Sequence, residues 1–266
     1  VQHDFIASIP GLENAKILQP GYAIEYDYVD ARELYPTMET KKIGGLFFAG
    51  QLNGTTGYEE AGGQGIIAGI NAALQATGDN QPFTLDRSDA YIGVMIDDLV
   101  TKGTIEPYRM FTSRAEYRIT LRSDNADQRL TPKAIALGTA CKKRTALFNK
   151  KALLLQKGTS LLQKLTITPT QAAKHHLNIN KDGKKRSAFS LLTYNNITKD
   201  DVVAIWPEIA LLDPDILSQL YIEAGYSTYL AKQHADIVSL KKDEALKIPK
   251  DFDYSLTSIS LSSEVR

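Results

Sequence analysis

Glycine is concentrated in one stretch of the chain, and this stretch restricts the possible folds more than any other feature. Ten of the 18 glycines lie between Gly44 and Gly78. The stretch opens with the apolar run 45–49, which is typical of a strand buried on both faces of a parallel sheet. A loop rich in glycine and threonine follows at 50–57, and residues 58–76 are predicted to form a helix of small residues. Glycine inside a helix costs ~1 kcal/mol relative to alanine, so this helix is expected to pack very closely on a sheet or a ligand.

A strand, a glycine turn and a helix start can together hold a ligand. The N–H groups of the first helical turn lack helical partners, and the helix dipole adds a partial charge of ~+0.5 there. Gly50, Gly54 and Gly57 would let a flat ligand approach the backbone, and the amides of Gln51 and Asn53 could hydrogen-bond to its edge. Spacing alone slightly favours the alternative, a tight connection whose glycines serve only the chain geometry.

The remainder of the chain is predicted to be largely helical. Residues 17–18 and 22–26 are β-like, and the alternation over 117–122 favours a strand, with a helix as the alternative. A polar loop is expected at 178–187, with a solvated tip at 181–186. Capping residues and apolar periodicity predict helices over 86–102, 131–138, 142–165, 168–176 and 213–246. The sequence therefore predicts a piece of strands and loops followed by an all-helical piece.

Composition excludes several classes of protein. No window approaches the ~18 consecutive apolar residues of a membrane span. The single cysteine, Cys141, excludes an internal disulfide framework and a multi-cysteine zinc site, and the four histidines predict no metal site. A soluble, cytoplasmic globular protein without membrane contact is expected.

The balance of 31 basic and 31 acidic residues hides a gradient along the chain. Residues 1–100 carry 5 basic and 14 acidic side chains, whereas residues 101–145 carry 10 basic and 4 acidic ones. The basic segment places arginines among aromatic residues, a combination that can pair with phosphates and stack on unpaired bases. The alternative is that nearby acidic residues pair with these arginines inside the protein. The arginines are Arg109, Arg114, Arg118, Arg122 and Arg129.

Four long motifs are more specific than any of these patterns. They are Gly45–Ala61 with Gln64–Ala73, Tyr91–Thr104 with Glu106–Arg118, Leu121–Asp127 with Arg129–Pro132, and Lys247–Tyr254. Together they resemble the MnmG/GidA family, flavoproteins that modify the wobble uridine of tRNA. The resemblance spans nearly the whole chain and is thin only over 140–210.

The resemblance implies an α+β fold that is mostly α. Residues 1–80 would form the C-terminal part of an FAD-binding domain, an incomplete Rossmann-like piece of strands, glycine-rich loop and helix. Residues 81–266 would form a helical domain that faces tRNA and a partner and stops before the family's C-terminal tail.

The resemblance also implies site residues. Gln51 would contact FAD, together with Gly50, Asn53, Gly54, Thr55, Thr56 and Gly57. The five arginines would bind tRNA. No catalytic residue is implied, because Cys141 matches no cysteine of the family and the family's redox-active cysteines belong to a region preceding Val1.

The implied activity of the parent protein is installation of an aminomethyl or carboxymethylaminomethyl group at the C5 position of the wobble uridine. FAD, NADH and methylene-tetrahydrofolate would take part, with an MnmE-type GTPase as partner and a homodimer as the assembly. The chain alone is expected to be inactive and to bind FAD weakly or not at all. Two alternatives stay open, a tRNA-binding or partner-docking module without chemistry and a folate- and FAD-dependent tRNA uridine methyltransferase.

Overall fold

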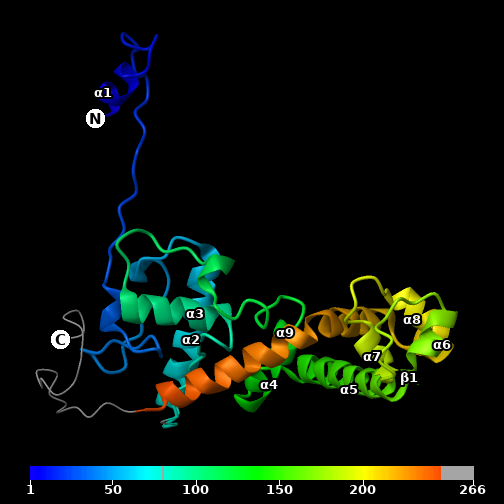
Figure 1. The fold of residues 1–266 in the computed structure, drawn as a ribbon. Coiled ribbons are helices and arrows are strands. Elements are labelled where there is room, and N and C mark those ends of the chain that lie inside the picture. Colours follow the sequence, from blue (N-terminus) through cyan, green and yellow to red (C-terminus); the bar gives the residue numbers. More distant parts are fainter. Residues whose placement is uncertain (80, 247–266) are drawn as a thin grey trace, which may run out of the picture. The chain divides into compact units, whose positions relative to one another are not determined.

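The computed structural model describes residues 1–79 and 81–246, so the Lys247–Tyr254 motif lies outside the described residues (Figure 1). Contacts divide the chain into two compact units. The first unit contains residues 1–84 and 92–111, and the second contains residues 85–91 and the chain from Thr112 onward. The described chain is mostly helical with one two-stranded sheet, which confirms the predicted fold class. The domain boundary expected at residues 80–81 stays a prediction.

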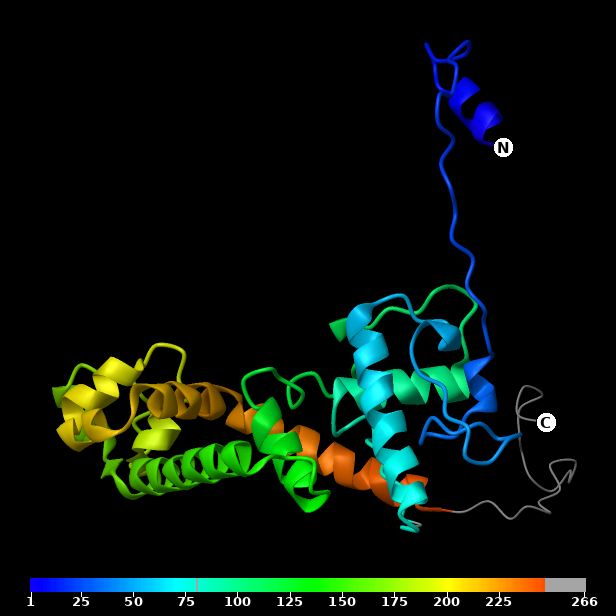
Figure 2. The same ribbon diagram turned by 180° about the vertical axis from the view of Figure 1, so that it is seen from behind.

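Two crossing helices organise the first unit. α2 (Tyr58–Ala76) has the predicted bounds, and α3 (Tyr91–Asp97) continues as a π-helical turn, η3 (Asp98–Lys102) (Figure 2). The unit also contains α1 (Gln2–Ala7) and two 3₁₀ turns, η1 (Ala31–Glu33) and η2 (Gln51–Asn53).

The strands predicted for the first unit do not form among its described residues. Phe47 makes only one isolated antiparallel bridge, to Glu39, so the parallel strand predicted at 45–49 is wrong. Residues 17–18 and 22–26 are not strands either, and Tyr22 is 88% exposed. A strand requires a neighbouring segment that satisfies its backbone N–H and C=O groups along its length, and among the described residues the segment 45–49 has only the short contact with 38–40.

Only one of the interior glycines of α2, Gly63, packs closely against a neighbouring element. A Cβ atom on Gly63 would lie 3.2 Å from both Ile92 Cγ1 and Met95 Cε, so this glycine allows α3 to approach. A Cβ atom on Gly62, Gly65 or Gly69 would meet open space among the described residues. Close packing therefore accounts for only one of these four glycines.

The second unit is built from helices and a small antiparallel sheet, in which Thr166 pairs with Ser187 and Ile167 with Arg186. The sheet strands are β1 (Thr166–Ile167) and β2 (Arg186–Ser187). The helices are η4 (Thr112–Arg114), α4 (Ala126–Ala136), α5 (Lys142–Lys164), α6 (Pro169–Lys174), α7 (Ala188–Leu191), α8 (Lys199–Ile205), η5 (Pro207–Leu211) and α9 (Pro214–Glu244).

Most helices of the second unit lie close to their predicted positions. α5, α6 and α9 match the predictions over 142–165, 168–176 and 213–246 to within a few residues. Thr168 forms a capping box that starts α6, and the carboxylate of Asp213 accepts hydrogen bonds from two N–H groups at the start of α9. The predicted start of a helix at Thr131 is wrong, because α4 begins at Ala126 and contains Pro132 in its interior. Residues 117–120 form turns and 121–122 are irregular, so the segment is neither a strand nor a helix.

An apolar core holds the second unit together. Leu162 of α5, Leu191 of α7 and Ile209 of η5 are completely buried in it. α5 and α9 run side by side, and a Cβ atom on Gly158 would lie 2.6 Å from Leu220 Cδ1 (Figure 1). The absence of a side chain at Gly158 therefore allows α5 and α9 to approach each other closely. Among the described residues, no helix combines the length and the apolar character needed to cross a membrane.

Candidate functional site

The loop between residues 50 and 57 has a backbone that requires glycine. Gly50 has φ +92° and Gly54 has φ +84°, values that side chains with a Cβ atom rarely adopt. A Cβ atom on Gly54 would also lie 2.5 Å from Thr104 Oγ1 and 3.0 Å from Tyr28 Cε2. The loop is therefore held close to two side chains that come from distant parts of the sequence.

A buried polar network fixes this loop to α2. Gln64 is completely buried, and its Oε1 accepts hydrogen bonds from Gly50 N (3.1 Å) and Asn53 Nδ2 (2.8 Å). Its Nε2 donates to Thr55 Oγ1 at 3.0 Å, and that hydroxyl donates to Gly50 O at 3.1 Å. The side chains of Asn53 and Thr55 therefore point inward and stabilise the loop. Asn53 Oδ1 is a buried acceptor for which the described residues provide no donor.

The outer side of the loop lines a hollow of about 310 Å³. Four of the seven predicted cofactor residues contribute to it, whereas Gly50, Asn53 and Gly57 do not. The opposite wall comes from residues 26–28 and 104–107. The four contributors are Gln51, Gly54, Thr55 and Thr56. The hollow thus combines an amide, hydroxyl groups, aromatic rings and the carboxylates of Asp27 and Glu106 around an exposed backbone turn, a combination suited to a flat polar ligand.

The start of α2 carries its own carboxylate. Glu60 is 6% exposed, and its Oε1 accepts a hydrogen bond from Met110 N at 2.8 Å. The same carboxylate folds back over Gly57, where a Cβ atom would collide with it. A negative charge at this position offsets part of the helix dipole. The positive end of α2 is therefore partly neutralised by the protein itself, as the two acidic residues in its first turn predict.

Sequence reasoning missed the residues that give the loop its shape. Gln64, Tyr28 and Thr104 were not predicted as site residues. Gln64 could have been noticed in the sequence, because it is the one polar side chain between Ala61 and Ala68. The other residues of this run are glycine, alanine and two isoleucines. An amide on the buried face of such a helix indicates a hydrogen-bonding role.

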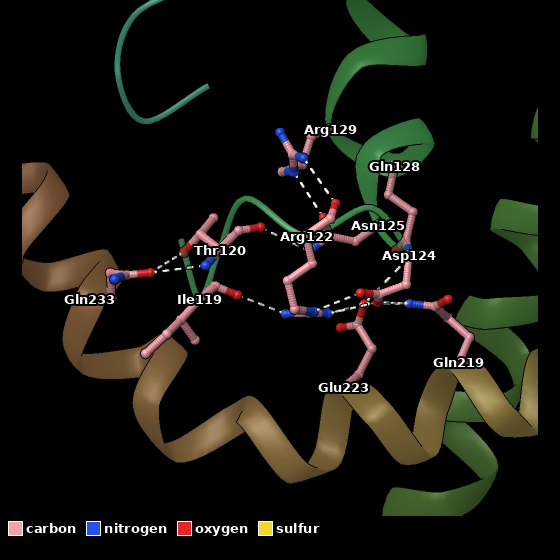
Figure 3. Close-up of polar contacts among 10 residues, drawn as sticks. All are labelled: Ile119, Thr120, Arg122, Asp124, Asn125, Gln128, Arg129, Gln219, Glu223 and Gln233. Carbon is pink, nitrogen blue, oxygen red and sulfur yellow. Dashed lines mark hydrogen bonds and ion pairs between the residues drawn. The ribbon is translucent and has the colours of Figure 1, made fainter. Parts of the chain in front are cut away.

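The predicted tRNA-binding arginines have different environments. Arg109, Arg114 and Arg118 are exposed, with Arg109 in the first unit and the other two in the second. Arg122 and Arg129 instead take part in an internal network (Figure 3). The alternative considered from sequence, internal pairing with nearby acidic residues, therefore describes Arg122.

Arg122 binds the 119–124 turn to α9 (Figure 3). Its side chain is 10% exposed and donates to Asp124 at 2.9 and 3.0 Å and to Ile119 O at 2.9 Å. Asp124 also accepts a hydrogen bond from Gln219 Nε2 of α9 at 2.8 Å. The hydrogen bonds from Arg122 lower the pKa of the Asp124 carboxyl below its ordinary value.

Arg129 completes the network by joining three backbone segments. It donates to Asn125 Oδ1 at 2.8 Å, to Arg122 O at 3.1 Å and to Asp89 O. Burial, followed by the nearby Arg122 charge, lowers the pKa of its guanidinium. Gln233 of α9 holds the other end of the turn, accepting from Thr120 N at 3.0 Å and Thr120 Oγ1 at 2.6 Å. These side chains hold the segment in shape.

No group of three or more His, Cys, Asp or Glu side chains within residues 1–79 and 81–246 could hold a metal ion. Cys141 is exposed at the start of α5.

Two family models match the chain. Residues 1–80 match "Glucose inhibited division protein A", and residues 142–234 match "tRNA modifying enzyme MnmG/GidA C-terminal helical domain". Among solved structures, Aquifex aeolicus GidA in its form II crystal is 43% identical with a TM-score of 0.77, over 98% of this chain and 41% of that one.

Curated relatives agree with both models. The chain is 48% identical over 260 residues to the "tRNA uridine 5-carboxymethylaminomethyl modification enzyme MnmG" of Latilactobacillus sakei, covering 96% of this chain and 41% of the relative. The enzyme of the same name from Granulibacter bethesdensis is 45% identical over 266 residues, covering 100% of this chain and 42% of the relative. The chain thus spans less than half the length of these relatives, and it belongs to the MnmG/GidA family.

Proposed function

We propose that this chain is the part of an FAD-dependent tRNA-modifying enzyme that holds one edge of the cofactor and contacts the RNA. The reaction would install a carboxymethylaminomethyl group at the C5 position of the wobble uridine. The observation that carries the proposal is the 48% identity to an enzyme named for that modification over 96% of this chain. The chain alone is expected to be inactive, because it spans 41% of that relative.

The glycine loop fits one edge of a flavin. Gln51 and Thr56 line the hollow and can hydrogen-bond to a ring edge or to ribityl hydroxyls, and Gly54 lets the ring approach the backbone. Asn53 and Thr55 would act by holding the loop, through their bonds to Gln64. Bound FAD would supply the transfer of electrons from NADH. Methylene-tetrahydrofolate as one-carbon donor, an MnmE-type GTPase as partner, a homodimer and a cytoplasmic location belong to the same proposal.

A pair of glycine variants of the full-length protein tests the cofactor assignment. Gly54→Ala places a Cβ atom against Thr104 and Tyr28 at a strained φ, so flavin content should fall at least several-fold. Gly62→Ala is the matched control, because its Cβ atom would meet open space on α2 and alanine favours a helix by ~1 kcal/mol. Absorbance of the bound flavin and thermal unfolding are measured for both variants. Full flavin content in a folded Gly54→Ala protein would contradict the assignment.

Two arginine variants form a second matched pair, which tests tRNA binding. We propose that the exposed Arg109, Arg114 and Arg118 contact phosphates, and that Arg122 and Arg129 support the segment from within. Arg118→Ala should reduce the slope of log affinity against log salt by about 1 and leave stability unchanged. Arg122→Ala should instead lower the stability of the second unit. A tRNA affinity that does not depend on salt would contradict the proposed RNA contact.

A further inference from the structure

The second unit contains a hollow that the proposed chemistry does not use. It has a volume of about 440 Å³ and lies against α9. Its wall includes Tyr194, Tyr221 and Tyr226, the amide of Asn195, and the ion pair that Arg122 forms with Asp124. Three aromatic rings with one neutral amide form an environment that suits a flat heterocycle with polar edges.

One ring of this wall is held in place while part of it stays accessible. The guanidinium carbon of Arg122 lies 4.7 Å from the centre of the Tyr226 ring, a cation–π contact, and Arg122 is itself fixed by Asp124. Tyr226 is nevertheless 40% exposed. A large aromatic ring that is fixed and exposed loses little conformational entropy when another ring stacks on it.

The connection between β1 and β2, residues 168–185, is a basic excursion of the chain that adjoins the hollow. The segment 168–185 leaves β1 and returns to β2, and its inner side is fixed by Ala172, Leu177 and Ile179 in the apolar core. Arg186 connects it to the hollow, because its Nε donates to Tyr194 Oη at 2.9 Å while its other nitrogens bind Asp182 at 3.0 Å.

Four exposed lysines of this segment form no ion pair with an acidic residue in the described part of the chain. They are Lys174, Lys181, Lys184 and Lys185, all exposed. Asp182 is the one acidic residue of the segment, and Arg186 already pairs with it. A cluster of exposed lysines next to an aromatic hollow is the combination that binds single-stranded nucleic acid, since the lysines attract phosphates and the rings stack on bases.

We propose that this surface binds an unpaired region of the RNA substrate, with one base in the tyrosine hollow and its phosphates on the lysine excursion. The inference rests on the proposed function, because it takes tRNA as the ligand. The site is separate from the glycine loop and its hollow, which lie in the first unit. It would position the RNA and take no part in the chemistry.

Two variants of the full-length protein test the two halves of this site, with unmodified tRNA transcript as the probe. Tyr226→Leu removes the stacking ring and should weaken binding about 5- to 100-fold without changing the salt slope. Tyr229→Leu is the matched control, because Tyr229 lies on the same helix, is 64% exposed and does not line the hollow. The combined change Lys181→Ala, Lys184→Ala and Lys185→Ala should lower the salt slope by about 2 to 3.

A charge-matched control and a competitor complete the test. Lys142→Ala, Lys143→Ala and Lys150→Ala remove the same charge from exposed positions of α5 and should change the slope less. A single-stranded oligonucleotide should compete with tRNA better than a duplex of equal length. Equal effects of both lysine triples, or of both tyrosine variants, would overturn the inference while leaving the proposed function intact. Absence of tRNA binding by the unmodified protein would instead contradict the proposed function.

Discussion

The glycine loop of the first unit and the apolar core of the second unit are held in place by different interactions. In the first unit, Asn53 and Gln64 are completely buried and close the glycine loop with directional hydrogen bonds. In the second, apolar side chains such as Leu162 and Leu191 form the core. A hydrogen bond needs one particular partner, whereas apolar burial depends on area and shape and accepts substitutes of similar size. The glycine loop is therefore expected to have stricter sequence requirements than the apolar core of the second unit.

The largest effect on stability is expected from the apolar core. Leu162→Ala removes a completely buried side chain from α5 and should lower the free energy of unfolding by about 2–5 kcal/mol. Leu153→Ala on the same helix, where the side chain is 50% exposed, should cost less than about 1 kcal/mol. Urea unfolding of both variants measures the difference. Similar losses at the two positions would show that α5 does not pack as described.

A smaller but more localised effect is expected from the polar network. Gln64→Leu leaves Gly50 N–H without its acceptor and removes one partner each from Asn53 and Thr55, so it should cost about 2–4 kcal/mol. Amide hydrogen exchange should speed up over residues 50–57 and stay unchanged in the second unit. Gln75→Leu is the control, because Gln75 is exposed on the same helix and bonds only to Glu39 among the described residues. Unchanged protection of Gly50 in the Gln64 variant would refute the role of this network.

The smallest effect is expected from acid. The pKa of Asp124 is lowered in the folded protein, chiefly by its hydrogen bonds from Arg122, so the folded state binds this proton less readily than the unfolded chain does. The resulting stabilisation is complete above the ordinary value of 3.8 and is lost as the pH falls below it through the folded-state pKa. Asp124→Asn should therefore reduce the loss of stability as the pH falls below 3.8, with Asp236→Asn on α9 as the charge-matched control. An identical acid transition in wild-type and Asp124→Asn proteins would contradict this linkage.

Long helices with clear end signals were predictable from the sequence. α2 follows a glycine turn, α6 begins with Thr168-Pro169 and α9 with Asp213-Pro214, and all three start at or beside the predicted residue. α4 was misplaced because Pro132 was taken as a first-turn residue, whereas it lies within the helix. Helix starts are therefore predictable where a capping residue or a proline in the first turn marks them.

The strands and much of the site depend on partners that are distant in sequence. The apolar run 45–49 has the composition of a strand, but a strand exists only where another segment pairs with it, and here one bridge forms. The inward orientation of Asn53 and Thr55 likewise depends on Gln64, on the following helix. The spacing of Arg122 and Arg129 is typical of phosphate-binding arginines, but in the folded chain their partners are Asp124 and Asn125. Residue type and spacing could identify these side chains but could not say which way they face.

The pairing of β1 with β2 has a consequence for how the helical unit can vary. Because two-residue strands bring the chain back to where it left the core, the tip at Asp182-Gly183 can be lengthened without moving Leu177 or Ile179. The entropic cost of closing such a loop rises by only about 0.6 kcal/mol for each doubling of its length. Insertions at Gly183 should accordingly leave the core of the second unit intact, whereas they would displace the neighbouring lysines of the proposed RNA surface.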